Sequence, residues 1–197
     1  MIDALLLGVV SFGRHAIGVV VRPYETYRHI AAKGTGGELA SLGMLFILYV
    51  AAISLIMPSR QFVTFFPSAL GGYLLSLAVF WLVGTLVGGS GRFLSVALGW
   101  GYTLLPTLVW FSVTSILYVV LPPPRTQHPA GIVFSIVYLA FSTMLFAWKL
   151  TLGYLTLRFG LKLDLPRIAV VGVVAIAAWS VYSIVMYRLG VFRIPFL

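Results

Sequence analysis

Long apolar runs separated by short polar connectors dominate the hydrophobic pattern of this chain. A helix that crosses a membrane needs about 20 predominantly apolar residues. Runs of that length, each bounded by charge, glycine or proline, cover residues 38–57, 65–88, 93–121, 131–157 and 168–187. The connectors between them are too short to hold a soluble domain. The pattern therefore predicts an all-α membrane protein whose five transmembrane helices form one bundle over residues 35–197.

The first 21 residues are apolar as well, but their polar positions are ordered. On a helical wheel the polar and small residues form one stripe, made of Asp3, Ser11, Arg14, His15 and Gly18. Such a pattern is typical of an amphipathic helix that lies in the membrane interface with its polar stripe towards water. A sixth span is the alternative, although an arginine at the centre of a span costs about 2.5 to 3.5 kcal/mol.

Residues 22–34 predict a second short surface helix. Pro23 suits its first turn, Lys33 suits its last turn, and Gly34 suits the position just past its end. We expect Glu25 to pair with Arg28 or His29 along its flank. Residues 1–34 would then form one or two amphipathic interfacial helices that precede the bundle on its cytoplasmic face.

The first predicted span begins at a capping box, because Thr35 and Glu38 have the required spacing. This places Glu38 at the membrane surface. No acidic residue is then expected in a spanning core, so chemistry by paired carboxylates is unsupported. Serines are many, but no histidine and aspartate are placed to activate one. We therefore predict no catalytic residue and no enzyme activity.

Composition agrees with a membrane location. The chain is 61% hydrophobic and 9% charged, whereas soluble domains carry roughly 25% charged residues. Its net charge of +9 would suggest nucleic acid in a soluble protein. Here the basic residues stand mainly at the ends of apolar runs, so anionic lipid headgroups are the expected partner and nucleic acid is not. The absence of cysteine excludes disulfides and thiolate metal sites.

The basic residues also predict an orientation. With five spans, eight of them fall on the side of the N-terminus and four on the other side: Arg14, Arg22, Arg28, Lys33, Arg92, Arg158, Lys162 and Arg167, against Arg60, Arg125, Arg188 and Arg193. The positive-inside rule therefore predicts a multi-pass protein of the plasma membrane with a cytoplasmic N-terminus and an external C-terminus. The first five residues of the larger group are the candidates for binding lipid headgroups.

Lys149, in the fourth predicted span, is the exceptional ionisable residue within a run. It could contact a substrate or an acidic partner inside the membrane. The interpretation favoured by its position, about two turns from the expected helix end, is that it extends to the headgroups. The histidines His15, His29 and His128 lack the spacing of a metal site and are expected on different surfaces. No metal and no cofactor are predicted.

Small residues and a proline mark expected contacts between helices. Gly84 and Gly88 have the spacing that lets helix backbones approach closely, and Gly101 thins the third span. We expect these contacts to lie inside the bundle, with contacts between two chains as the alternative. Pro106 predicts a kink in the third span. The "GGSGR" turn at residues 88–92 is expected to join two helices, with a lipid phosphate near Arg92 as a lesser possibility.

Four segments together resemble the Yip1-domain family of polytopic integral membrane proteins, in its prokaryotic branch. They are "RPYETYRHI" before the first span, the second span "GGYLLSLAVFWLVGTLVGG", the element "GYTLLP" with Gly101, Tyr102 and Pro106, and the segment "AWKLTLGYLTLRFGLKLDLPRIAVV". The resemblance implies a five-span bundle with no catalytic residue and no cofactor. Eukaryotic members are linked to Rab GTPases, but the acidic Asp-Leu-Tyr-Gly-Pro element of that branch is not found here.

Two functions follow as hypotheses. The first is a non-enzymatic membrane scaffold or accessory subunit that binds another membrane protein, or a multi-subunit membrane complex, and anionic lipid. The second is a transporter or permease component for an apolar or lipid-like substrate, with Lys149 as the substrate contact.

Overall fold

The computed structural model describes residues 2–56, 62–120 and 129–190, and in these parts of the chain it contains eight α-helices, one π-helical turn and no strand. In chain order they are α1 (Ile2–Val21), α2 (Pro23–Lys33), α3 (Gly36–Ile56), α4 (Phe62–Leu86), α5 (Phe93–Tyr102), α6 (Leu104–Val120), α7 (Pro129–Leu155), the π-helical turn η1 (Thr156–Gly160) and α8 (Leu165–Arg188). The all-α prediction is therefore confirmed.

Four helical stretches in the described residues are long and apolar enough to cross a membrane: Val63–Leu86, Phe93–Leu117, Gly131–Gly160 and Leu165–Arg188. They correspond to the second to fifth predicted spans. The first predicted span is helix α3, whose apolar part Gly36–Ala52 is shorter. Four spans are thus supported by length and composition, and a fifth stays a prediction.

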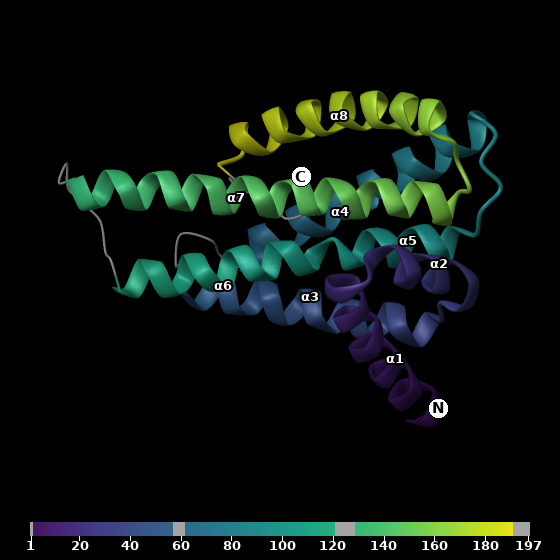
Figure 1. Cartoon of the computed structure of the whole chain (residues 1–197), viewed down its shortest axis with the longest axis horizontal. Helices are drawn as coiled ribbons and strands as arrows, with labels where there is room; N and C mark the ends of the chain where they lie inside the picture. Colours follow the sequence, from purple (N-terminus) through teal and green to yellow (C-terminus); the bar gives the residue numbers. More distant parts are fainter. Residues whose placement is uncertain (1, 57–61, 121–128, 191–197) are drawn as a thin grey trace.

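The long helices run in roughly the same direction, and α5 lies among them (Figure 1). Helix α5 contacts α2, α3, α4, α7 and η1, and all of its residues from Ser95 to Tyr102 are buried. Small residues make this central position possible. A Cβ on Gly99 would lie 3.0 Å from the hydroxyl oxygen of Thr156. Helices α7 and α8 lie on the outside, and few of their residues are buried.

The third predicted span is interrupted as its proline suggested. Helix α5 ends at Tyr102 and α6 begins at Leu104. Pro106 has no backbone N–H to give to the carbonyl of Tyr102 one turn earlier, which removes one helical hydrogen bond at this point. At the same point the N–H of Thr103 donates to the carbonyl of Trp100, three residues earlier, at 3.1 Å.

Three connecting segments meet at one end of the bundle, where α2 lies (Figure 1). The N–H of Ser90, in the α4–α5 turn, donates to the carbonyl of Leu161 at 3.0 Å. The hydroxyl of Ser95 donates to the carbonyl of Ala31 at 2.9 Å. The basic connectors expected on one side of the membrane are therefore close together. Arg60, Arg125 and Arg193, expected on the other side, lie outside the described residues.

Gly88 has a different place from the one predicted. Helix α4 ends at Leu86, and Gly88 follows it with a φ of 94°. Its N–H donates to the carbonyl of Thr85 at 3.0 Å, and the N–H of Gly89 donates to the carbonyl of Gly84 at 2.8 Å. This pair of bonds is a Schellman motif, which favours glycine in the left-handed position. Gly88 therefore ends the helix and is not a packing residue within it.

Helix α2 has the predicted bounds. Pro23 is its first residue, Lys33 lies in its last turn, and Gly34 follows. Its buried face holds Tyr27, whose hydroxyl donates to the carbonyl of Gly99 at 2.9 Å. Burial raises the pKa of Tyr27, so the hydroxyl remains a donor. This bond attaches α2 to the central helix α5.

Candidate functional site

Glu38 is the most informative residue of the site because its side chain is 0% exposed. It lies in the first turn of α3, and its N–H donates to the hydroxyl oxygen of Thr35 at 3.4 Å. Thr35 therefore caps the helix as predicted. The second bond of a capping box would run from the N–H of Thr35 to the Glu38 carboxylate. It is not among the contacts described for Glu38, because the carboxylate points towards α1 and α5.

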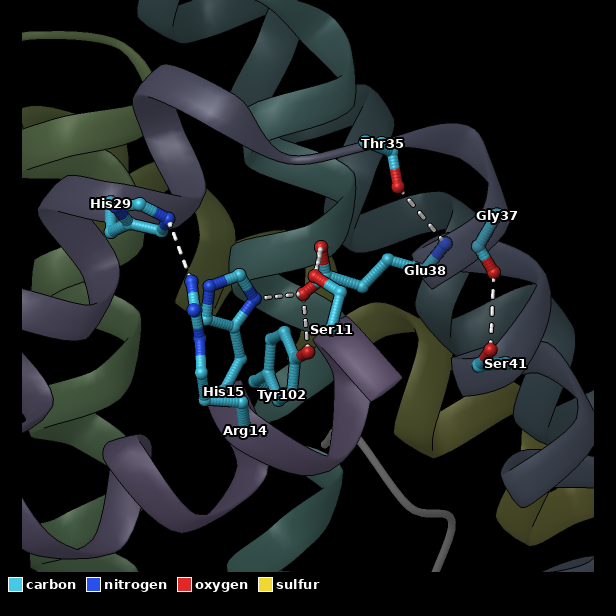
Figure 2. Close-up of polar contacts among 9 residues, drawn as sticks. All are labelled: Ser11, Arg14, His15, His29, Thr35, Gly37, Glu38, Ser41 and Tyr102. Atoms are coloured by element: carbon cyan, nitrogen blue, oxygen red, sulfur yellow. Dashed lines mark hydrogen bonds and ion pairs between the residues drawn. The ribbon is translucent and has the colours of Figure 1, made fainter. Parts of the chain in front are cut away.

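Three side chains from two other helices converge on this carboxylate (Figure 2). Nδ1 of His15 lies 2.5 Å from Oε1, and the hydroxyl of Tyr102 donates to the same oxygen. The hydroxyl of Ser11 donates to Oε2 at 3.4 Å. A carboxylate accepts hydrogen bonds through both oxygens, so Glu38 is the common acceptor for α1 and α5. We call these four residues, Ser11, His15, Glu38 and Tyr102, the Glu38 cluster.

The cluster corrects the prediction for α1. Its polar stripe was expected to face water, but Ser11 and His15 face α3, and His15 is 4% exposed. Glu38 on α3 explains this orientation, because a buried imidazole needs a hydrogen-bond partner. The outward face of α1 is apolar, with more than half of each side chain exposed at Leu7, Val9, Val10, Ile17, Val20 and Val21.

Two close contacts bring α1 against its neighbours. A Cβ on Gly8 would lie 2.6 Å from the carbonyl carbon of Gly37, so the two backbones touch at the start of α3. A Cβ on Gly18 would lie 2.5 Å from the hydroxyl oxygen of Thr26 in α2. Glycine at these positions lets α1 approach closely enough for His15 to reach Glu38.

The two N-terminal histidines are neighbours, which corrects the prediction that they lie on different surfaces. The ring centroids of His15 and His29 are 5.3 Å apart. Nη2 of Arg14 lies 3.3 Å from Nε2 of His29, and arginine can only donate, so His29 accepts there as a neutral ring (Figure 2). Burial first, and then the neighbouring His15, Lys33 and Arg14, lower the pKa of His29, while Glu38 acts in the opposite direction.

The described residues contain no group of three or more histidine, cysteine, aspartate or glutamate side chains placed to hold a metal ion. His128 lies outside the described residues. Nε2 of His15 is buried and has no hydrogen-bond partner in the described part of the chain. The contact between Nδ1 of His15 and Glu38 therefore has a structural role, which is to hold α1 against α3.

The five predicted headgroup ligands are all exposed: Arg14, Arg22, Arg28, Lys33 and Arg92. Arg22 pairs with Glu25 at 3.6 Å, whereas the sequence suggested Arg28 or His29 as the partner of Glu25. Arg92 donates to the carbonyl of Ala32 at 3.3 Å, at the C-terminal end of α2. A cation at this position stabilises the helix end, because it donates to a free carbonyl and faces the negative end of the helix dipole. Lipid binding by these residues stays a prediction.

Gly84 and Gly101, two of the predicted packing residues, make their close contacts with other segments of the same chain. A Cβ on Gly84 would be 2.4 Å from Cδ1 of Leu161, and one on Gly101 would be 2.9 Å from Cδ1 of Leu42. Gly101 also lines a small apolar pocket of about 200 Å³ between α3, α4, α5 and the start of α6. Both glycines therefore bring segments of the same chain together.

Lys149 lies in α7 and lines a second, larger groove of about 410 Å³. The apolar helix continues through η1 to Gly160, further than the predicted end at residue 157. Lys149 is therefore about three helical turns from the end of the apolar helix, where the sequence suggested about two. The extension of its amine to the headgroups stays a prediction.

Sequence reasoning missed the Glu38 cluster because it assigned Glu38 to the capping box alone. The available signal was the pair Ser11 and His15, two polar residues one helical turn apart on the polar stripe of this segment. Such a stripe fits an acidic partner as well as it fits water. A wheel diagram indicates that the residues share a face, but it does not indicate what that face contacts.

The fold defines the class of protein: it is all-helical in its described parts, with four helices suited to crossing a membrane, as in a multi-pass membrane protein. No family model, curated protein or solved structure matches the chain. The resemblance to Yip1-domain proteins therefore stays a prediction.

Proposed function

We propose that this protein is a non-enzymatic membrane scaffold or accessory subunit, which binds anionic lipid and a membrane-protein partner on the surface formed by α1 and α2. The observation that carries this proposal is the enclosure of Glu38. Its carboxylate is fully buried and accepts bonds from Ser11, His15 and Tyr102. A carboxylate in this position supports the structure by holding α1 in place, and it is not accessible to a substrate.

With α1 held in this position, an apolar face and a group of exposed cations lie next to each other on α1 and α2. The outward side chains of α1 are apolar and exposed, while Arg14, on the same helix, and Arg28 and Lys33, on α2, are exposed cations. An apolar face beside cations is the combination that favours anionic membrane surfaces. In Figure 1, α1 crosses the long direction of the bundle obliquely, as a helix lying near the membrane plane would. We infer that α3, the first predicted span, also crosses the membrane and brings the number of spans to five. We also infer that this surface lies on the cytoplasmic leaflet of the plasma membrane.

The test is lipid and partner retention by the full-length protein. A variant with Arg14, Arg22, Arg28 and Lys33 all replaced by Gln would be purified in a mild detergent beside the wild type, and bound lipids and proteins would be identified by mass spectrometry. We expect the wild type to retain phosphatidylglycerol over phosphatidylcholine, and to retain a stoichiometric membrane protein. The fourfold variant should lose most of both.

A control variant carries Lys162→Gln and Arg188→Gln, two exposed cations outside α1 and α2. It should retain lipid and partner like the wild type. Equal retention by the fourfold variant and the wild type would contradict the proposal.

A further inference from the structure

A lateral groove lies between α7 and α8, on residues that differ from those of the proposed scaffold surface. It has a volume of about 410 Å³ and is lined from α4, α5, α7, η1 and α8. Pockets that hold small ligands usually measure about 300 to 1,000 Å³. The groove therefore has the size of a small-molecule site.

Three aromatic rings belong to the lining. The rings of Trp100 and Trp179 are stacked with centroids 5.7 Å apart, and Phe80 meets Trp100 edge-on at 4.9 Å. Nε1 of Trp179 donates to the hydroxyl of Ser76 at 3.0 Å, which fixes the orientation of that ring. These contacts make a rigid apolar wall against which a hydrocarbon chain can pack.

Lys149 is the one basic or acidic residue among the described residues that line the groove. No ion-pair partner for its amine is found in the described parts of the chain. The helix that carries it covers 30 residues, Gly131–Gly160. If the helix is centred, Lys149 lies about 5 Å from the midplane and about 10 Å inside the hydrocarbon edge. An amine at this depth needs an anionic partner.

We propose that the groove binds a long-chain carboxylic acid, with its carboxylate paired to the Lys149 ammonium and its chain against Phe80, Trp100 and Trp179. The acid supplies the negative charge that the lining lacks and the apolar surface that the aromatic wall matches. A carboxylic acid can reach this depth because it becomes neutral when it takes up a proton. A phospholipid phosphate keeps its charge near neutral pH and stays at the surface. This site goes beyond the scaffold role and does not depend on it.

Two glycines in the lining allow a precise test of occupancy. A Cβ on Gly172 would have no atom within 4 Å other than its own helix, and Gly172 belongs to the groove lining, so the side chain of Gly172→Leu starts in open space at the groove. Val173, the next residue, is 68% exposed and is not part of the lining. Val173→Leu is therefore a matched control on the same helix.

The experiment uses the full-length protein in nanodiscs and a photoreactive diazirine analogue of palmitic acid, with the labelled peptides found by mass spectrometry. We expect saturable labelling of α7 and α8, competed by palmitic acid and much less by hexadecanol or phosphatidylglycerol. Lys149→Gln should lower this labelling by about tenfold or more, since a charge-assisted bond is lost. Lys149→Arg and the control Arg188→Gln should retain it.

Gly172→Leu should lower labelling as strongly as Lys149→Gln while Val173→Leu leaves it unchanged, and this pair decides the matter if Lys149→Gln does not fold. The proposal is overturned if Lys149→Gln labels like the wild type, or if hexadecanol competes as well as palmitic acid. It is also overturned if an acidic helix of a co-purified protein crosslinks to the groove and palmitic acid cannot displace it.

Discussion

Nδ1 of His15 lies 2.5 Å from Oε1 of Glu38, and this contact joins the N-terminal helix α1 to the start of α3 across 23 residues of sequence. Both side chains are almost fully buried, at 4% and 0% exposure. Tyr102 donates to the same carboxylate from the central helix α5. One acidic side chain therefore holds together the first, third and fifth helices.

Removing that side chain should destabilise the protein strongly. Glu38→Ala leaves His15, Tyr102 and Ser11 without their common acceptor, and breaking a buried charged network typically costs about 3 to 5 kcal/mol. The measurement is the free energy of unfolding by denaturant titration in detergent micelles. Ser41→Ala is the control, because Ser41 donates only to the carbonyl of Gly37 in its own helix. A loss at Glu38 no larger than that at Ser41 would show that the cluster is unimportant for stability.

The close approach of α1 to α3 predicts opposite effects for two glycines on one helix. Gly8→Ala places a methyl group against the backbone of Gly37, and overpacking of this kind costs about 1 to 3 kcal/mol. Gly13→Ala meets nothing within 4 Å and should be neutral or stabilising, since alanine favours helix by up to about 1 kcal/mol. Thermal unfolding of both variants measures this difference. The account of α1 packing fails if both alanines have the same effect.

The contact between the two turns at the α2 end predicts a sensitive site at Gly91. A Cβ there would lie 1.5 Å from the carbonyl oxygen of Gly160, so Gly91→Ala must separate the α4–α5 turn from η1. We expect a lower unfolding temperature and faster proteolysis of this end of the bundle. Gly36→Ala serves as the control because its Cβ would have open space. Unchanged unfolding and proteolysis in Gly91→Ala would contradict the packing of these turns.

Stability should fall as the solution is acidified, in part through His29. Its pKa in the folded protein is below the ordinary value of 6.5 because of burial and nearby positive charge. The unfolded chain therefore binds this proton more readily. The stabilising contribution of neutral His29 is present above about pH 6.5 and is lost as the pH falls through the folded pKa. Protonation also removes the acceptor for Arg14.

Unfolding temperatures between pH 8 and pH 5 test this prediction, with His29→Gln for comparison. The variant should show a shallower fall than the wild type over the same range. Parallel curves for the two proteins would assign the acid sensitivity to other groups.

Local features of the fold followed from the sequence where a single residue type imposes them. Pro23 and Gly34 marked the bounds of α2, Thr35 marked the cap of α3, and Pro106 marked the interruption of the third span. In each case the cause is a backbone or capping preference that acts within about one helical turn. Such preferences can be recognised without knowing the tertiary contacts.

The cluster and the groove depend on contacts between distant segments, and these were not predicted. Ser11 and His15 were placed on the correct stripe, but the stripe was assigned to water, since nothing in the local pattern identified Glu38 as its partner. The sequence also predicts an end of the fourth span at residue 157, whereas the π-helical turn continues the helix to Gly160. The position of Lys149 relative to the helix end therefore differs from the prediction by about one turn.

The most direct test of the central claim, that the Glu38 cluster holds α1 on the bundle, is a distance measurement by pulsed electron paramagnetic resonance in nanodiscs. The chain has no cysteine, so spin labels attach uniquely to Val10→Cys on α1 and Leu48→Cys on α3, two exposed positions. We predict one narrow distance distribution with Glu38 present and a broad, longer one in the Glu38→Ala background. Identical distributions in the two backgrounds would contradict the claim.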